Sequence, residues 1–208
     1  METDRNNVQE LAKSQHAVID KMRERRNLIL ELSTTFDILS GDFQRLLDLT
    51  REQSTKNNED GVWFFSRSAI RAGFALFEFS TYMFFHITLM SDASNVTSPP
   101  FDKEKVESFT SGNWRKFRMS TFDTFKFAVE SIKAAYSISY QPDFGRHEWG
   151  RFKEAIAKRD GFMHPKKSTD VLLGAVEYDK IGEGMQWIVN EITRFFDEVL
   201  ASLNNSSN

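Results

Sequence analysis

The residues of this chain best suited to chemistry lie close together near its C-terminal third: Arg159, Asp160 and His164, with Pro165 immediately after them. An arginine can bind a phosphate through two parallel hydrogen bonds. A histidine can transfer protons near neutral pH. A guanidinium, a carboxylate and an imidazole within one or two helical turns are the minimum set for cutting an RNA phosphodiester without a metal ion. The segment therefore predicts a phosphate-directed site.

Arg159 extends a stripe of large apolar residues, in which Trp149, Phe152 and Ile156 recur on one face of an expected helix. Because a buried, unpaired guanidinium is costly, we expect Arg159 to have a carboxylate partner or to face a cleft. Glu78 is the expected partner, since it interrupts the most apolar stretch of the chain. The competing interpretation is an ion-paired core arginine without a catalytic role.

The spacing between Arg159 and His164 requires a change in the backbone, because positions five apart on a straight helix point away from each other. Pro165 disfavours the α conformation at His164, and Gly161 loosens the turn before it. We therefore expect the chain to leave the helix around Asp160 and to bring the imidazole toward the guanidinium. Asp160 would then orient the imidazole or hold the local turn.

Lysines flank the segment and predict a local cationic patch. Lys158 precedes Arg159, and Lys166 and Lys167 follow Pro165, so these three are the candidate substrate-binding residues. The formal net charge of the chain is -3, so it has no overall basic field and any RNA contact must come from such a patch. The alternative is an ordinary run of solvated surface lysines.

The composition favours long helices as the elements that position these groups. The 208 residues include only 10 Gly and 4 Pro, and no segment shows sustained alternation of apolar and polar residues. The 20 phenylalanines can fill a large core. We expect an all-α helical bundle. Cysteine is absent and the four histidines have no metal-ligand spacing, so we expect no metal and no cofactor.

The first part of the chain carries a heptad pattern. Apolar residues from Val8 to Leu46 recur in steps of three, four and seven, with Gln15 and Arg25 as polar interruptions. The pattern predicts a long amphipathic, coiled-coil-like helix, with a possible break at Ser40-Gly41. That helix would either lie on its own domain or pair with a second chain, since both arrangements use the same heptads.

A polar turn at residues 56–61 divides this arm from the rest, so the expected domains are 1–56 and 62–203. The stretch from Ala69 to Met90 is apolar, but Arg71, Glu78 and His86 interrupt it, which favours a buried core helix over a membrane span. We expect a cytoplasmic protein that does not enter membranes. The expected helices after the turn are 63–93, 103–109, 114–140, 146–158 and 178–199.

The arrangement of Arg159, Asp160 and His164 resembles the HEPN superfamily (higher eukaryotes and prokaryotes nucleotide-binding domains). The mark of that superfamily is an arginine, a polar residue and then a histidine a few positions on. Here the motif follows an amphipathic helix and precedes a proline and a final long helix. The central segment Arg71-Ala72-Gly73-Phe74-Ala75-Leu76-Phe77-Glu78 is similar to the early helix of the family. The resemblance covers residues 62–203 and leaves out residues 1–56.

The resemblance implies a metal-independent endoribonuclease that forms a homodimer, with two copies of the motif in one cleft at the interface. His164 would act as general base or acid, Arg159 would stabilise the charge on the phosphorane and Asp160 would position one or both. Many relatives are toxins or antiviral-defence effectors, which implies an inhibitory or activating protein partner. Others have lost catalysis, so the alternative function is a helical scaffold that binds a protein partner through the seam from Val8 to Leu46.

Overall fold

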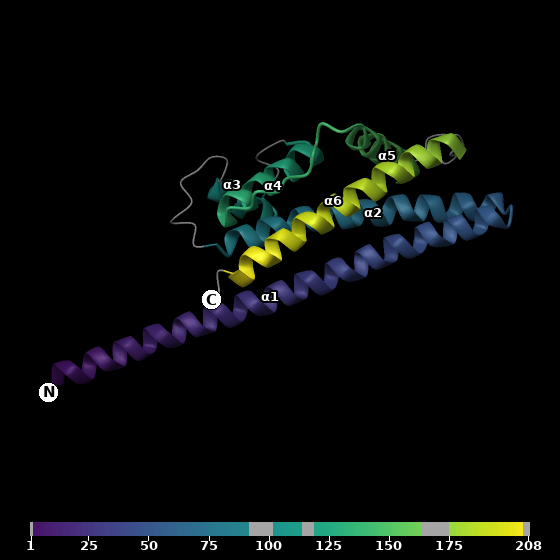
Figure 1. Cartoon of the computed structure of the whole chain (residues 1–208). Coiled ribbons are helices and arrows are strands. Elements are labelled where there is room, and N and C mark those ends of the chain that lie inside the picture. Colours follow the sequence, from purple (N-terminus) through teal and green to yellow (C-terminus); the bar gives the residue numbers. More distant parts are fainter. Residues whose placement is uncertain (1, 92–101, 114–118, 164–174, 206–208) are drawn as a thin grey trace. The chain divides into compact units, whose positions relative to one another are not determined.

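The computed structural model describes residues 2–91, 102–113, 119–163 and 175–205 (Figure 1), and the side chains of residues 16, 19–91, 102–113, 119–159 and 179–203 within them. Throughout this described part the chain forms helices and no strand, which confirms the expected all-α fold. The helices are α1 (Glu2–Thr55), α2 (Glu59–Leu89), α3 (Lys103–Thr110), α4 (Thr121–Tyr136), α5 (His147–Met163) and α6 (Ala175–Asn205).

Helix α1 is continuous over 54 residues, so the possible break at Ser40-Gly41 does not occur. A glycine inside a helix costs only about 1 kcal/mol relative to alanine, which the hydrogen bonds on either side readily offset. The chain consists of two compact units, Met1–Thr35 and Phe36–Asn208, and the boundary between them falls within α1. Residues 56–58 connect α1 to α2, so the connection is shorter than the polar turn expected at 56–61, whose last three residues belong to α2.

Met1–Thr35 is a purely helical unit from Glu2 onward. Three apolar side chains in it remain more than half exposed: Ile19 (53%), Met22 (58%) and Leu30 (55%).

The second unit is arranged around α2, which contacts α3, α4, α5 and α6. The largest of its fully buried side chains are phenylalanines, in line with the many phenylalanines of the sequence. The ring of Phe77 on α2 lies 4.6 Å from that of Phe125 on α4 and 4.8 Å from that of Phe152 on α5. Buried aromatic side chains contribute much of the stability of a core, because each removes a large apolar area from water. The many buried residues of α2 confirm the buried core helix that the sequence predicts. Among the described residues, none of the helices is both long and apolar enough to span a bilayer.

Side-chain caps set the helix boundaries around α2 and α4. Asn58 accepts a hydrogen bond from the backbone N–H of Gly61 at 3.2 Å and so begins α2. Ser120 accepts one from the N–H of Asp123 at 3.1 Å, so α4 begins at Thr121. At the other end Ser137 adopts a left-handed conformation with φ 54°, which stops the helix. Helix α4 is therefore shorter than the expected 114–140.

Helix α6 packs against both α2 and α5 (Figure 1). The apolar stripe expected from the sequence faces this core. Its described members are all buried: Ile181, Met185, Ile188, Ile192, Phe195 and Val199.

Two glycines allow backbones and side chains to approach closely around α6. A Cβ atom at Gly184 would overlap the backbone N of Phe152 and lie 2.7 Å from the carbonyl C of Arg151, both on α5. A Cβ atom at Gly73 on α2 would overlap the Met185 side chain. The absence of these atoms lets α6 seat closely on its neighbours, and it fixes the position of α5.

Two long-range hydrogen bonds join three helix ends. The hydroxyl of Tyr136, the last residue of α4, donates to the carbonyl of Ile87 in the last turn of α2 at 2.8 Å. The hydroxyl of Ser202 in α6 donates to the carbonyl of Tyr136 at 3.0 Å. The carbonyl of Ile87 also accepts from the backbone N–H of Met90 at 3.1 Å, so the Tyr136 hydroxyl is its second donor.

Candidate functional site

Arg159 lies on α5 and continues the inward face formed by Trp149, Phe152 and Ile156, as the sequence predicts. Those three side chains are buried, whereas Arg159 is half-buried. Its guanidinium carbon Cζ lies 3.8 Å from the centre of the Phe74 ring on α2. A guanidinium over an aromatic face is attracted by the negative face of the ring, and its N–H donors lie in the guanidinium plane. The face of the guanidinium thus stacks on the ring, while its N–H donors point outward in the guanidinium plane.

The ring beneath Arg159 belongs to the core. Phe74 is 4% exposed, and its centroid lies 6.2 Å from that of Phe77. The orientation of the guanidinium is therefore set by packed side chains of α2 and not by a flexible surface contact. The sequence did not identify Phe74 as the stacking partner of Arg159, because a partner on another helix leaves no local signal.

Glu78 lies one helical turn after Phe74 on α2 and is exposed. The pairing that we expected between Glu78 and Arg159 assumed a guanidinium taken wholly out of water. A half-buried guanidinium has a smaller desolvation penalty to offset. The role of Glu78 as the partner of Arg159 stays a prediction.

The end of α5 corrects one expectation. The helix continues through Asp160 and Gly161 to Met163, so the chain does not leave the helix around Asp160. Pro165 restricts the residue before it, which leaves Met163 free to remain helical. The cost of Gly161, about 1 kcal/mol, is small beside the packing of an amphipathic helix. The side chain of Asp160 lies outside the described residues, as does the whole of His164.

Of the three lysines predicted to bind substrate, Lys158 is exposed on α5. Lys166 and Lys167 lie outside the described residues. Among the described residues, the predicted site thus consists of Arg159 on its Phe74 platform, with Lys158 beside it in sequence and Glu78 one turn along α2.

Two further arginines, Arg67 and Arg71, lie on the face of α2 that carries Phe74. Arg67 and Arg71 precede Phe74 by seven and three residues, and residues at these spacings share one helical face. Together with Phe64 and Ser68 they line a cavity of about 300 Å³. Phe64 is 58% exposed, unusually high for an aromatic residue of a core helix. The spacing of Phe64, Arg67 and Arg71 was the signal in the sequence that could have identified this cationic surface.

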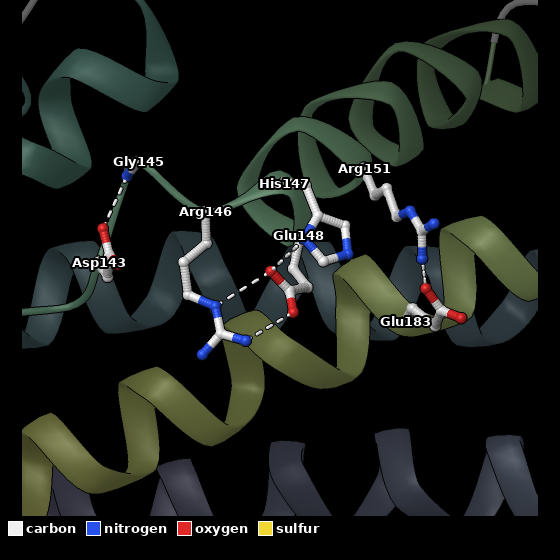
Figure 2. A network of polar contacts seen from close by, with 7 residues as sticks. All are labelled: Asp143, Gly145, Arg146, His147, Glu148, Arg151 and Glu183. Atoms are coloured by element: carbon white, nitrogen blue, oxygen red, sulfur yellow. Dashed lines mark hydrogen bonds and ion pairs between the residues drawn. The ribbon is translucent and has the colours of Figure 1, made fainter.

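A second group of polar side chains surrounds the first turn of α5 (Figure 2). Arg146 donates from Nε and Nη2 to the two carboxylate oxygens of Glu148, at 3.1 and 2.8 Å. Nδ1 of His147 lies 3.1 Å from Oε2 of Glu148. The backbone N–H of Glu148 and then the Arg146 guanidinium hold the pKa of this carboxyl below its usual value.

This second group serves the packing of α5 better than it serves phosphate binding. Arg151 of α5 pairs with Glu183 of α6 (Figure 2). The cavity of about 660 Å³ beside it is lined by Arg51 and by three carboxylates, those of Glu148, Asp179 and Glu183. Carboxylates repel a phosphate backbone, so this lining is less suited to a phosphate than the arginines on α2 and α5.

Among the described residues, no group of three or more His, Asp or Glu side chains is arranged to hold a metal ion. Comparison of the chain with protein-family models, with curated proteins and with solved structures gives no match.

Proposed function

We propose that this chain is a metal-independent endoribonuclease in which Arg159 binds the scissile phosphate. The observation that carries the proposal is the stacking of the Arg159 guanidinium on Phe74 at 3.8 Å. This contact fixes the plane of the donors before any substrate arrives, and preorganised donors cost no reorganisation during the reaction. Partial burial also strengthens the attraction between the guanidinium and a phosphate.

In the proposed reaction His164 accepts the proton of the ribose 2′-hydroxyl, whose oxygen attacks the adjacent phosphorus. The bond from phosphorus to the 5′-oxygen of the next nucleotide breaks, and that oxygen takes up the proton that His164 removed from the 2′-hydroxyl. The products are a 2′,3′-cyclic phosphate and a 5′-hydroxyl. Arg159 stabilises the negative charge on the phosphorane, and Asp160 positions the imidazole or the guanidinium.

Flanking phosphates would contact the remaining cations. Arg67 and Arg71 on α2, with Lys158 on α5, supply the described part of this surface. Lys166 and Lys167 are proposed to complete it.

The proposed assembly is a homodimer with two copies of the motif in one cleft. The proposed biological setting is that of a toxin or an antiviral effector in the cytoplasm, restrained or triggered by a protein partner. The HEPN resemblance of Arg159, Asp160 and His164 supports both proposals.

The test is cleavage of total RNA by purified protein in excess EDTA, with the fragment ends identified chemically. We expect Arg159→Lys to lower the rate about 100-fold or more, since removing one preorganised donor to a transition-state oxyanion costs on the order of 10² to 10³. His164→Ala should abolish cleavage. Arg194→Lys is the matched control, because Arg194 stacks on Tyr140 at 4.2 Å in a comparable way outside the proposed site. Unchanged rates in both Arg159→Lys and His164→Ala would refute the proposal.

The alternative proposal is a catalytically silent scaffold that binds a partner through α1. The exposed Ile19, Met22 and Leu30 favour it, because apolar side chains on a helix are covered when two helices pair. The scaffold predicts a motif arginine fully sequestered by Glu78, which would leave no donor for a phosphate. The pairing of Arg159 with Glu78 stays a prediction that separates the two proposals.

A further inference from the structure

The part of α1 in the first compact unit carries exposed side chains along one face. Ile19, Met22, Arg26 and Leu30 are spaced by three and four residues, so they share one side of the helix over about three turns. We call these four residues the α1 stripe. All four are exposed, and each of the three apolar members is more than half exposed. The α1 stripe therefore presents an apolar face with a guanidinium near its middle.

Arg26 determines which occupant fits this face. Among the described residues its guanidinium has no ion pair and no hydrogen bond, whereas Arg23 on the same helix pairs with Asp20 at 3.4 Å. A helix that packed along the stripe would cover Arg26 between Met22 and Leu30. Because a buried, unpaired guanidinium is costly, the occupant has to supply a carboxylate. An arginine can hold such a carboxylate through two parallel hydrogen bonds.

The sequence around the α1 stripe is basic as well. Residues 19–30 include four basic and two acidic side chains, a net charge of +2, in a chain whose formal net charge is -3. Opposite charges on two surfaces steer them together and fix their register. The chain as a whole repels an acidic partner, so selectivity for an acidic helix has to come from this segment.

The same face of a second copy is a less suitable occupant. In an antiparallel pair with Ile19 opposite Leu30 of the second copy, Arg23 lies opposite Arg26 of that copy. In a parallel pair in register, Arg26 lies beside its own equivalent. Both symmetric arrangements bring like charges together, which costs free energy in an interface.

A membrane surface is also a less suitable occupant. Helices that lie in a bilayer interface insert an apolar face and keep their cationic side chains on the polar face. Arg26 instead lies within the apolar stripe, between Met22 and Leu30 in the helical register. Insertion of the stripe would carry its guanidinium toward the acyl chains.

We propose that the α1 stripe binds an amphipathic helix of another protein, whose apolar residues cover Ile19, Met22 and Leu30 and whose Glu or Asp pairs with Arg26. Anchor residues at spacings of three and four are the usual means by which one helix recognises another. The inference rests on the protein partner of the proposed function and states its chemistry. Because the stripe takes no part in RNA cleavage, it serves an active ribonuclease and a silent scaffold alike.

The test uses two labelled synthetic peptides with the same heptad repeat and leucine at both core positions. Each has about 21 residues, which at about 1.5 Å per residue spans the stripe. One carries glutamate at the flanking positions and the other carries lysine, so like charges oppose the self-association of either peptide. Fluorescence anisotropy measures binding to the full-length protein. We expect the glutamate peptide to bind at least about tenfold more tightly, a difference of about 1.4 kcal/mol.

Three variants separate the charge of the stripe from its apolar area. Arg26→Glu should remove the preference, because it replaces the central cation with an anion. Arg45→Glu is the matched control and should keep the preference, although it changes the net charge equally. Arg45 is an exposed arginine of α1 in the second compact unit, and it too has no ion pair among the described residues. Leu30→Ser should weaken binding of the glutamate peptide, since it removes apolar area and leaves the charges unchanged.

Equal binding of the two peptides, binding of neither, or an undiminished preference in Arg26→Glu would each overturn the proposal. Sedimentation velocity tests the second copy, since a dimer that Leu30→Ser dissociates would show that another copy covers the stripe. Vesicles of phosphatidylglycerol test the membrane. Vesicle binding that Leu30→Ser abolishes would assign the stripe to a lipid surface and overturn the protein partner.

RNA cleavage is measured in parallel with the same proteins. Arg26 lies outside the proposed catalytic site, so Arg26→Glu should cleave RNA at the wild-type rate. Selective binding of the glutamate peptide without RNA cleavage would support the docking of a helix on α1 and refute the ribonuclease. RNA cleavage without peptide binding would refute the docking and leave the ribonuclease standing. The two failures are therefore distinguishable.

Discussion

The close seating of α6 on α5 predicts that Gly184→Ala destabilises the protein, although the same change is normally favourable inside a helix. Alanine is preferred over glycine at interior helical positions by about 1 kcal/mol. At Gly184, however, the new methyl group would overlap the backbone N of Phe152 and lie 2.7 Å from the carbonyl C of Arg151. A backbone cannot rotate away as a side chain can, so α5 and α6 must move apart.

The magnitude follows from these opposing effects. Overpacking of a well-filled core typically costs about 1–3 kcal/mol. Subtracting the helix-propensity gain of about 1 kcal/mol leaves a net loss of about 0–2 kcal/mol in the free energy of unfolding. The matched control is Gly182→Ala, two residues earlier on α6, where a Cβ atom would meet nothing within 4 Å. This control should gain about 1 kcal/mol.

Urea denaturation followed by circular dichroism measures both variants. We expect Gly184→Ala to be less stable than Gly182→Ala by about 1–3 kcal/mol, the overpacking cost alone. Tryptophan fluorescence gives a local readout, because the rings of Trp149 on α5 and Trp187 on α6 lie 6.1 Å apart. If both substitutions stabilised the protein equally and the fluorescence did not change, the α5–α6 interface would accommodate a methyl group at residue 184, and the reasoning would be wrong.

Two other side chains give predictions about stability. Ser131 on α4 is fully buried, and its hydroxyl has no hydrogen-bond partner among the described residues. Since an unpaired buried hydroxyl costs about 1–3 kcal/mol, Ser131→Ala should raise the urea midpoint, and a lowered midpoint would contradict this reasoning. Burial, followed by a 2.6 Å hydrogen bond to Glu191, raises the pKa of Tyr140 from 10.0 to about 12. Folding therefore favours the neutral phenol, and its stabilisation is complete below pH 10 and lost as the pH rises to about 12. Tyr140→Phe should be less stable than wild type at pH 8, and the difference should shrink toward pH 12; a constant difference would exclude the linkage.

The sequence predicted the helices well where the signal is local. The six described positions of the α6 stripe, from Ile181 to Val199, are all buried, because a period of 3.6 residues directly reports a one-sided core contact. The heptad pattern likewise predicted a long first helix. The pattern left a break at Ser40-Gly41 possible, but the helix is continuous there, since one glycine costs little against a long run of intrahelical hydrogen bonds.

The site was harder to predict, because it depends on contacts between helices. Arg159 was identified by type and by position on its helix, but its stacking on Phe74 requires the packing of α5 on α2. The continuation of α5 through Asp160 and Gly161 likewise depends on contacts between helices. Local preferences indicated an earlier end, and tertiary packing extended the helix to Met163.

The hydrogen bonds among Ile87, Tyr136 and Ser202 have a consequence for motion. Helix ends ordinarily open and close independently, and their amide protons exchange quickly with solvent. Here the last turns of α2 and α4 and the α6 turn around Ser202 share donors and acceptors, so opening one breaks a bond of another. These segments should exchange as one cooperative unit. A change near the end of α6, such as Ser202→Ala, would then be felt in the amide exchange of α4 and, through Tyr136, at the end of α2.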